Sequence, residues 1–314
     1  MGVACHPGTS YPSNAISIKL YPLDFDEFLL ANNQEKLLKK VASEERIANS
    51  DHLILKKWYE NYLFVGGMPQ CVITFAETGN INSVREEQQK ILTLFERDFI
   101  KYAANTETTR RLRELWQNIP AQLVRRIDSH HFSFKYLSKG VSKKEYAMPL
   151  MWLEDCGLVI LVHKNAEGKR MPLTLYDQND IFRVHLLDTG LLQAILTETL
   201  LTSKKASADL KYIMAEQFAA QELFKTAYRQ KLRFWSNDTY EVDFLLECAE
   251  GVIPLEIKSG KSCTSKSLSY FCKKYNPPFS IVASLAEENI HGEIKHIPLY
   301  SLGHLKKFIN FYSS

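Results

Sequence analysis

Three charged residues in the last third of the chain have the types and spacing of a metal-assisted hydrolytic site. Asp243 lies in 240-YEVDFLLE-247, and Glu256 and Lys258 lie in 252-VIPLEIKS-259. Both segments are predicted strands joined by a short turn. Side chains alternate between the two faces of a strand, so Glu256 and Lys258 share one face. We therefore expect a hairpin in which Asp243 lies opposite Glu256 or Lys258.

The chemistry that these residues favour is hydrolysis assisted by a hard cation. Two carboxylates and a backbone carbonyl suit Mg²⁺, which prefers oxygen ligands and keeps several water molecules. We expect Asp243, Glu256 and the carbonyl of Ile257 to be the ligands, and Lys258 to position a metal-bound water. Glu216 stands on an apolar helix face, where an acid needs a partner, and the metal or Lys258 would supply one. The alternative is a solvated cross-strand charge pattern on an amphipathic hairpin.

A second candidate site is a basic region between residues 101 and 146. It holds ten lysines and arginines and four acidic residues, a local charge of +6. Helices here precede two β-rich segments, 158–164 and 182–188, which is the order of a winged helix. Lysines in the first turn of a helix attract phosphate, which favours contact with a nucleic-acid backbone. The alternative is a solvated surface on a winged helix that packs against protein. The candidate DNA-binding residues are Arg110, Arg111, Arg113, Arg125, Arg126, Lys135, Lys139, Lys143 and Lys144.

The composition is that of a folded protein without extreme charge. The 314 residues are 45% hydrophobic and 24% charged, and the net charge is +3. The length predicts two or three domains, and the small net charge excludes a whole-chain attraction to nucleic acid. No apolar run approaches the roughly 18 residues of a membrane span, and the six cysteines lack metal-binding spacing. We expect a cytoplasmic protein with buried or idle thiols and no membrane contact.

Several segments resemble a large family of prokaryotic AAA-type ATPases that carry a C-terminal module of unknown function. The stretches EVDFLLE, GVIPLEIKSGK and MAEQFAAQEL resemble the PD-(D/E)xK nuclease-like core, and more closely this module. Five further segments match the family in the expected order. They are 20-LYPLDFDEFL-29, 65-VGGMP-69, 119-IPAQL-123, 143-KKEYAMPLMWLEDCGLV-159 and 186-LLDTGLL-192.

The resemblance implies a mixed α/β protein made of a helical lid region, a winged helix and a restriction-endonuclease-like α/β domain. On this basis residues 1–30 are a remnant of an ATPase core and 31–105 the helical lid region. Residues 106–200 are then the winged-helix domain, and residues 201–314 the PD-(D/E)xK nuclease-like domain. The chain thus resembles the C-terminal portion of a family member that lacks most of the N-terminal ATPase core.

The sequence has no phosphate-binding loop of the form G-x-x-x-x-G-K-[ST]. The nearest fragment is Gly260-Lys261-Ser262, but the position that requires the first glycine is Leu255. Nothing else in the sequence cradles nucleotide phosphates. We therefore expect no ATP site and no ATPase activity from this chain.

Two functional hypotheses follow from these patterns. In the first, the chain has a DNA-linked role and a Mg²⁺-dependent phosphodiesterase site at Glu216, Asp243, Glu256 and Lys258. In the second, the nuclease-like fold is catalytically idle, and the chain is a regulatory module that binds nucleic acid or protein. The expected partners are DNA, a protein or a second copy of the chain. The sequence leaves the substrate, the partner and the oligomeric state open.

Overall fold

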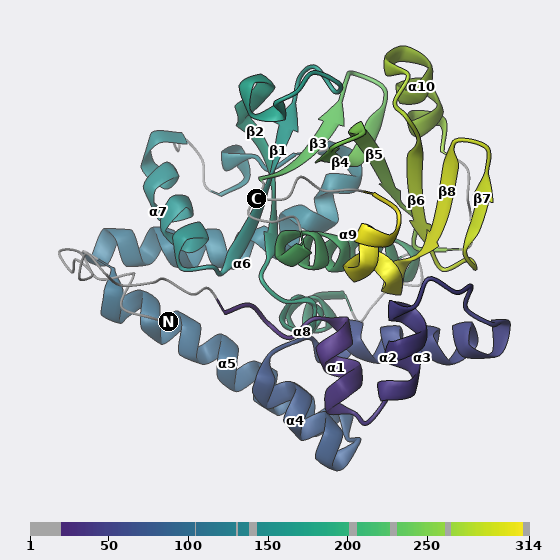
Figure 1. Cartoon of the computed structure of the whole chain (residues 1–314). Coiled ribbons are helices and arrows are strands. Elements are labelled where there is room, and N and C mark those ends of the chain that lie inside the picture. Colours follow the sequence, from purple (N-terminus) through teal and green to yellow (C-terminus); the bar gives the residue numbers. More distant parts are fainter. Residues whose placement is uncertain are drawn as a thin grey trace, which may run out of the picture.

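The structure is a computed structural model that describes residues 20–103, 105–129, 131–137, 143–200, 206–226, 231–260 and 265–309. Helices dominate the first half of the described chain, and strands enter after residue 158 (Figure 1). The sheet crosses the upper part of the molecule in Figure 1, and helices α1 to α5 gather below it. The chain therefore combines a helical layer with a mixed sheet, as the sequence predicts.

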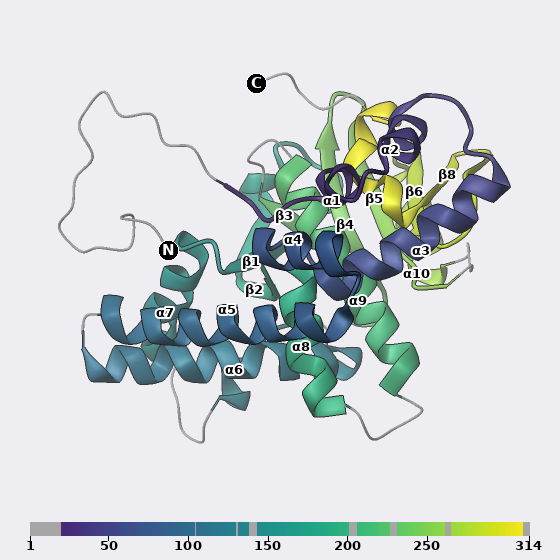
Figure 2. The same ribbon diagram turned by 90° about the horizontal axis from the view of Figure 1, so that it is seen from below.

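The first seven α-helices precede the sheet. They are α1 (Phe25–Ala31), α2 (Glu35–Ala42), α3 (Asn49–Val65), α4 (Pro69–Thr78), α5 (Ile81–Tyr102), α6 (Thr106–Ser129) and α7 (Lys143–Asp155), with the short helix η2 (Phe134–Tyr136) before α7. Figure 2 shows α5 and α6 running side by side as a long helical pair. At the start of α1, Asp24 forms a capping box with Glu27, which satisfies two free backbone N–H groups.

The described strands form one mixed eight-stranded sheet in the order β2-β1-β3-β4-β5-β6-β8-β7. They are β1 (Val159–Asn165), β2 (Asp177–Leu186), β3 (Leu232–Ser236), β4 (Glu241–Cys248), β5 (Gly251–Ile257), β6 (Ser280–Ser284), β7 (Asn289–His291) and β8 (Ile294–Pro298). The remaining helical elements are η3 (Leu173–Tyr176), α8 (Thr189–Leu200), α9 (Ala206–Thr226), α10 (Lys266–Tyr275) and η4 (Leu299–Lys307). Strands β3, β4 and β5 form an antiparallel meander, and β5, β6 and β8 run parallel.

Alternate residues of the central strands enter two separate cores. Phe234 and Phe244 point into the main core with α9, while Trp235 and Leu245 join the smaller core under α10. Because neighbouring strand residues face opposite ways, α9 and α10 cover opposite faces of the sheet. Helix α9 also contacts α6, α8 and the C-terminal η4, so it is the central helix of the fold.

The hairpin that the sequence assigns to a winged helix is part of this sheet. Strands β1 and β2 pair antiparallel, and β1 continues into the C-terminal strands through a parallel pairing with β3. The predicted boundary at residue 200 therefore falls between strands of one sheet. The mixed α/β class is confirmed, and the winged-helix assignment stays a prediction.

No helix in the described ranges is long and apolar enough to cross a lipid bilayer. Three cysteines fit the expected idle thiols, since Cys71, Cys248 and Cys272 are free and the first two are buried. Cys156 is disulfide-bonded, which departs from that expectation.

Candidate functional site

The β4–β5 hairpin brings Asp243, Glu256 and Lys258 together, as the spacing predicts. Phe244 pairs with Leu255 in the antiparallel register, which sets Asp243 level with Glu256. The backbone N–H of Ile257 donates to Asp243 Oδ2 at 2.8 Å, and Lys258 Nζ donates to Glu256 Oε1 at 2.7 Å. Both carboxyl groups are buried, because Asp243 and Glu256 expose only 3% and 5% of their surface.

Arg183 of β2 lies at the centre of this carboxylate cluster. Its Nη1 is 2.9 Å from Glu216 Oε1 and 3.9 Å from Asp243 Oδ1, and its Nη2 pairs with Glu241. The guanidinium carbon lies 4.0 Å from the centre of the Phe234 ring, which adds a cation–π contact. The Arg183 side chain has no exposed surface. The positive charge of Arg183 therefore balances the negative charge of these carboxylates.

Glu216 has the partner that its position on an apolar helix face requires. The sequence predicts a metal or Lys258 in that role, but the observed partner is Arg183. Lys258 instead bonds to Glu256, and 26% of its side chain is exposed. Arg183 is the residue that sequence reasoning missed. Its signal was a cation between the apolar residues Phe182 and Val184 of a predicted strand, which needs an acid once that strand is buried.

Burial shifts the protonation of both site carboxyl groups. Loss of solvation raises the pKa of Asp243 well above its ordinary value, and the nearby charges of Glu256 and Glu216 raise it further. Burial also raises the pKa of Glu256, while Lys258 and Ser265 act in the opposite direction. Proton uptake at these groups lowers the negative charge available to a metal ion.

Two of the predicted magnesium ligands, Asp243 and Glu256, lie level with each other on the hairpin. Within the ranges that the structure describes, no three acidic, histidine or cysteine side chains come close enough to hold a metal ion. Both oxygens of Asp243 accept hydrogen bonds, from Ile257 N–H and from the Tyr212 hydroxyl at 3.0 Å. Mg²⁺ requires near-octahedral oxygen ligation, so an ion at Asp243 would compete with these two hydrogen bonds. The ion stays a prediction.

The predicted DNA-binding residues are partly neutralised within the chain. Arg110 pairs with Glu107 and Glu114, and Arg111 pairs with Glu107 at 2.8 Å. Beyond these, Arg111 also pairs with Glu145, and Lys143 pairs with Asp180. Lys135 and Lys144 are exposed, and Arg113 is half-buried. Lys139 and the side chains of Arg125 and Arg126 lie outside the described part of the chain.

A second convergence of polar groups lies around Asp188, at the end of β2. Its carboxylate accepts from Gly67 N–H at 2.6 Å and from Leu191 N–H at 2.9 Å, so it caps α8 and holds the glycine turn. Gly66, at the end of α3, has a φ of +75°, and a Cβ there would overlap Asp188. Leu23 N–H donates to the Gly67 carbonyl at 2.8 Å. Three of the segments quoted for the family resemblance, 20–29, 65–69 and 186–192, therefore meet at one place.

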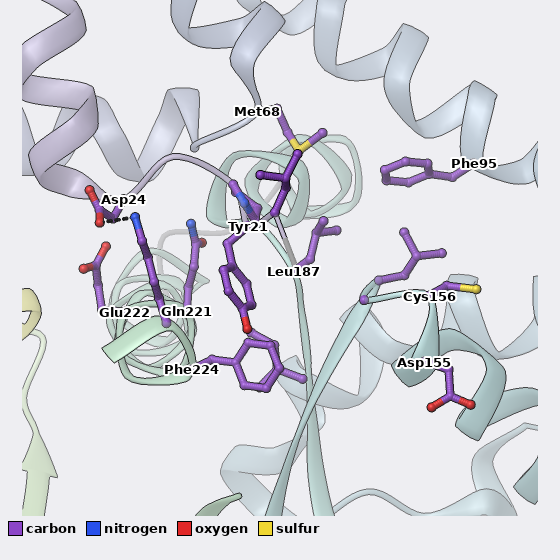
Figure 3. Close-up of a pocket in the computed structure, with 16 residues that line it drawn as sticks. Tyr21, Asp24, Met68, Phe95, Asp155, Cys156, Leu187, Gln221, Glu222 and Phe224 are labelled. Atoms are coloured by element: carbon purple, nitrogen blue, oxygen red, sulfur yellow. Dashed lines mark hydrogen bonds and ion pairs between the residues drawn. The ribbon is translucent and has the colours of Figure 1, made fainter. Parts of the chain in front are cut away.

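A pocket of about 280 Å³ lies beside this junction (Figure 3). Its wall is mainly apolar and includes Tyr21, Phe95 and Phe224. Asp24 at its rim pairs with Lys225, and the neighbouring Glu222 accepts a hydrogen bond from Phe25 N–H at 3.2 Å. Asp24, Glu222 and Lys225 are thus engaged by the protein where α1 meets α9, while Asp155 at the end of α7 also lines the pocket.

Two protein-family models match the chain, and both describe domains of unknown function. DUF8612 matches residues 56–202 and DUF4143 matches residues 213–302. DUF4143 is often found with AAA ATPases, which agrees with part of the resemblance expected from the sequence. No similar curated protein was found. No similar solved structure was found either.

Proposed function

We propose that the chain is a catalytically idle, nuclease-like module that works with an AAA-type ATPase. The order of α9, strands β3 to β5, α10 and β6 supports the nuclease-like reading of the C-terminal part. The DUF4143 match over residues 213–302 supports the link to an AAA-type ATPase. The absence of a phosphate-binding loop from the sequence means that ATP hydrolysis belongs to the partner.

The observation that carries this proposal is the position of the Arg183 guanidinium. It is fully buried between Glu216 and Glu241, with Asp243 beside it. A buried arginine balanced by hydrogen-bonded acids is a structural ion-pair network, and opening it leaves unpaired charges in the interior. The low exposure of Asp243 and Glu256 also keeps a phosphodiester away from the carboxylates. In this proposal, the buried carboxylates around Arg183 stabilise the fold and take no part in catalysis.

A protein partner suits the basic region better than DNA does. Three of the nine candidate cations, Arg110, Arg111 and Lys143, are held by acids of the chain. Each such pair must open before the cation can meet a phosphate, so the electrostatic gain from counterion release falls.

The second candidate function is a Mg²⁺-dependent phosphodiesterase, and one observation supports it. Glu256 Oε2 is buried and has no hydrogen-bond partner among the described residues. An unsatisfied buried acceptor is uncommon in folded proteins and marks a position that a ligand could satisfy. In this reading Arg183 moves aside, and Lys258 is placed beside the scissile phosphate of DNA.

One assay separates the two candidates. The full chain is incubated with linear and branched DNA in Mg²⁺ or Mn²⁺, beside the variants Asp243→Asn and Lys258→Ala. We expect no metal-dependent cleavage above that of either variant. Cleavage that Lys258→Ala abolishes while its circular dichroism and melting temperature stay unchanged would establish the phosphodiesterase instead. Lys258→Ala is the informative variant, because the side chain is partly exposed and its loss spares the core.

A further inference from the structure

Helix α7 carries an exposed stripe of four side chains, Lys144, Met148, Met151 and Asp155. Their spacings of four, three and four residues place them on one helix face. Met148 exposes 70% of its surface and Met151 exposes 52%, and the two charged residues are exposed as well. The opposite face of α7 packs on α6 and β1, so the stripe points away from the core.

The stripe has the chemistry of a docking surface. Methionine is flexible and polarizable, and it is common at adaptable interfaces. Lys144 and Asp155 form no ion pair with any residue in the described ranges, whereas the adjacent Lys143 is held by Asp180. Helix α7 lies on the outer side of the molecule, beyond the β1–β2 end of the sheet (Figure 1). The stripe is therefore open to a partner.

The order of the four residues is self-complementary. Lys144 and Asp155 lie equally far from a point between residues 149 and 150, and so do Met148 and Met151. If two copies of this helix pair antiparallel about that point, Lys144 faces Asp155 of the other copy. Met148 then faces Met151 of the other copy. A two-fold axis brings identical patches together, which is the commonest symmetry of soluble oligomers.

We propose that the α7 stripe docks on the α7 stripe of a second copy, forming an antiparallel two-fold dimer. Each methionine pair is then flanked by an ion pair, so apolar contact and charge complementarity act together. A nucleic acid fits this face poorly, because Asp155 would meet its phosphates. One pair of helix faces is smaller than a standard interface, so the dimer is weak and forms reversibly with concentration.

Charge reversal tests the antiparallel arrangement directly. Sedimentation of the full chain over a concentration series gives the dimer dissociation constant for the parent and for Lys144→Asp, Asp155→Lys and the double swap. Each single reversal sets like charges opposite each other at both ends of the interface, and we expect about tenfold or greater weakening. The double swap re-forms both pairs with reversed sign, and we expect the parent constant to return.

Matched variants on another helix control for surface charge alone. Leu53 is 54% exposed on α3 and Lys57 lies one turn further on the same helix. Met148→Glu is expected to abolish the dimer, and Leu53→Glu and Lys57→Glu are expected to leave it unchanged. A chain that stays monomeric at all concentrations overturns the proposal. The proposal is also overturned if the α7 variants leave the dimer dissociation constant unchanged, or if the double swap does not restore the parent value.

Discussion

Arg183 and Glu216 form a buried ion pair, with Nη1 of the arginine 2.9 Å from Oε1 of the glutamate. The two residues come from β2 and α9, so the pair ties the N-terminal hairpin of the sheet to the central helix. The side chains expose 0% and 2% of their surface. Water therefore cannot take the place of either partner when the other is removed.

Removing the charge of Arg183 should be costly. We expect Arg183→Met to lower the free energy of unfolding by about 3–5 kcal/mol, because it leaves buried carboxylates unpaired. Urea denaturation gives this value. A double-mutant cycle with Glu216→Gln should show a coupling energy above about 1 kcal/mol, since the two residues share one network.

Arg46 supplies the control for this experiment. Its side chain is 70% exposed and lies 3.5 Å from Glu287, and exposed pairs of this kind contribute about 1 kcal/mol or less. Arg46→Met should therefore change stability little. Equal losses for Arg183→Met and Arg46→Met would show that the buried network does not stabilise the fold.

The sequence predicts the hairpin that carries the candidate site but not the cation within it. Alternation along 240–247 and 252–259 places Asp243 beside Glu256, because register in a hairpin follows from turn length and local pattern. Arg183 is 60 residues before Asp243, and the pairing that brings β2 near β4 passes through β1 and β3. Local periodicity holds no information on such non-local pairing. The sequence indicates only that Glu216, an acid on an apolar face, and Arg183, a cation in a predicted strand, each need a partner of opposite charge.

The difference between local and non-local pairing also explains which cations of the basic region, residues 101–146, are paired within the chain. Counting charges between residues 101 and 146 gives a net excess, but it says nothing about geometry. In the helices, Arg110 lies three and four residues from two acids and pairs with both, as i, i+3 and i, i+4 spacing allows. Lys143 pairs with Asp180, which lies outside the counted segment. Local pairing could have been read from the spacing, whereas the pairing with Asp180 could not.

Gly66 should tolerate no side chain. We expect Gly66→Ala to destabilise the protein in two ways. Its backbone, with φ +75° and ψ −169°, lies in a region that is essentially restricted to glycine and costs another residue about 1–3 kcal/mol. Its new Cβ would also overlap Asp188, and overpacking costs about 1–3 kcal/mol more. Thermal and urea denaturation measure the total loss.

Gly157 is a comparison position with positive φ at which a new Cβ meets no neighbour. Its φ of +70° is nearly the same, but a Cβ there would meet nothing within 4 Å. Gly157→Ala should therefore show only the backbone cost. If both variants lose the same stability, then the close approach of Gly66 to Asp188 is not a constraint on the fold.

Asp188 should make the protein more stable at mildly acidic pH. Burial raises the pKa of Asp188 from 3.8 to about 6, against the lowering effect of its backbone hydrogen bonds. Between these values the folded state holds a proton that the unfolded state releases, so stability falls as pH rises. The full contribution is present below pH 3.8 and is lost above about pH 6. Its size is about 2–3 kcal/mol.

The variant Asp188→Asn isolates this contribution. Asparagine does not titrate, so the free energy of unfolding of the parent minus that of the variant should decrease as pH rises from about 4 to about 6. Urea denaturation across that range gives both values. A constant difference would mean that the Asp188 carboxyl group titrates alike in the folded and unfolded states.

Binding to DNA should depend less on salt concentration than the nine candidate cations together would predict. If all nine candidate cations met phosphates, the logarithm of affinity would fall against the logarithm of salt concentration with a slope of about −8. Internal pairing of Arg110, Arg111 and Lys143 leaves six of the nine, and we expect a slope no steeper than about −5. Fluorescence anisotropy with labelled duplex DNA measures the slope, with Arg110→Ala compared against Lys135→Ala. The exposed Lys135 should account for more of the slope than Arg110.

A slope near −8, which Arg110→Ala reduces by about one, would show that the ion pairs open on DNA and that nucleic acid is a partner of this surface.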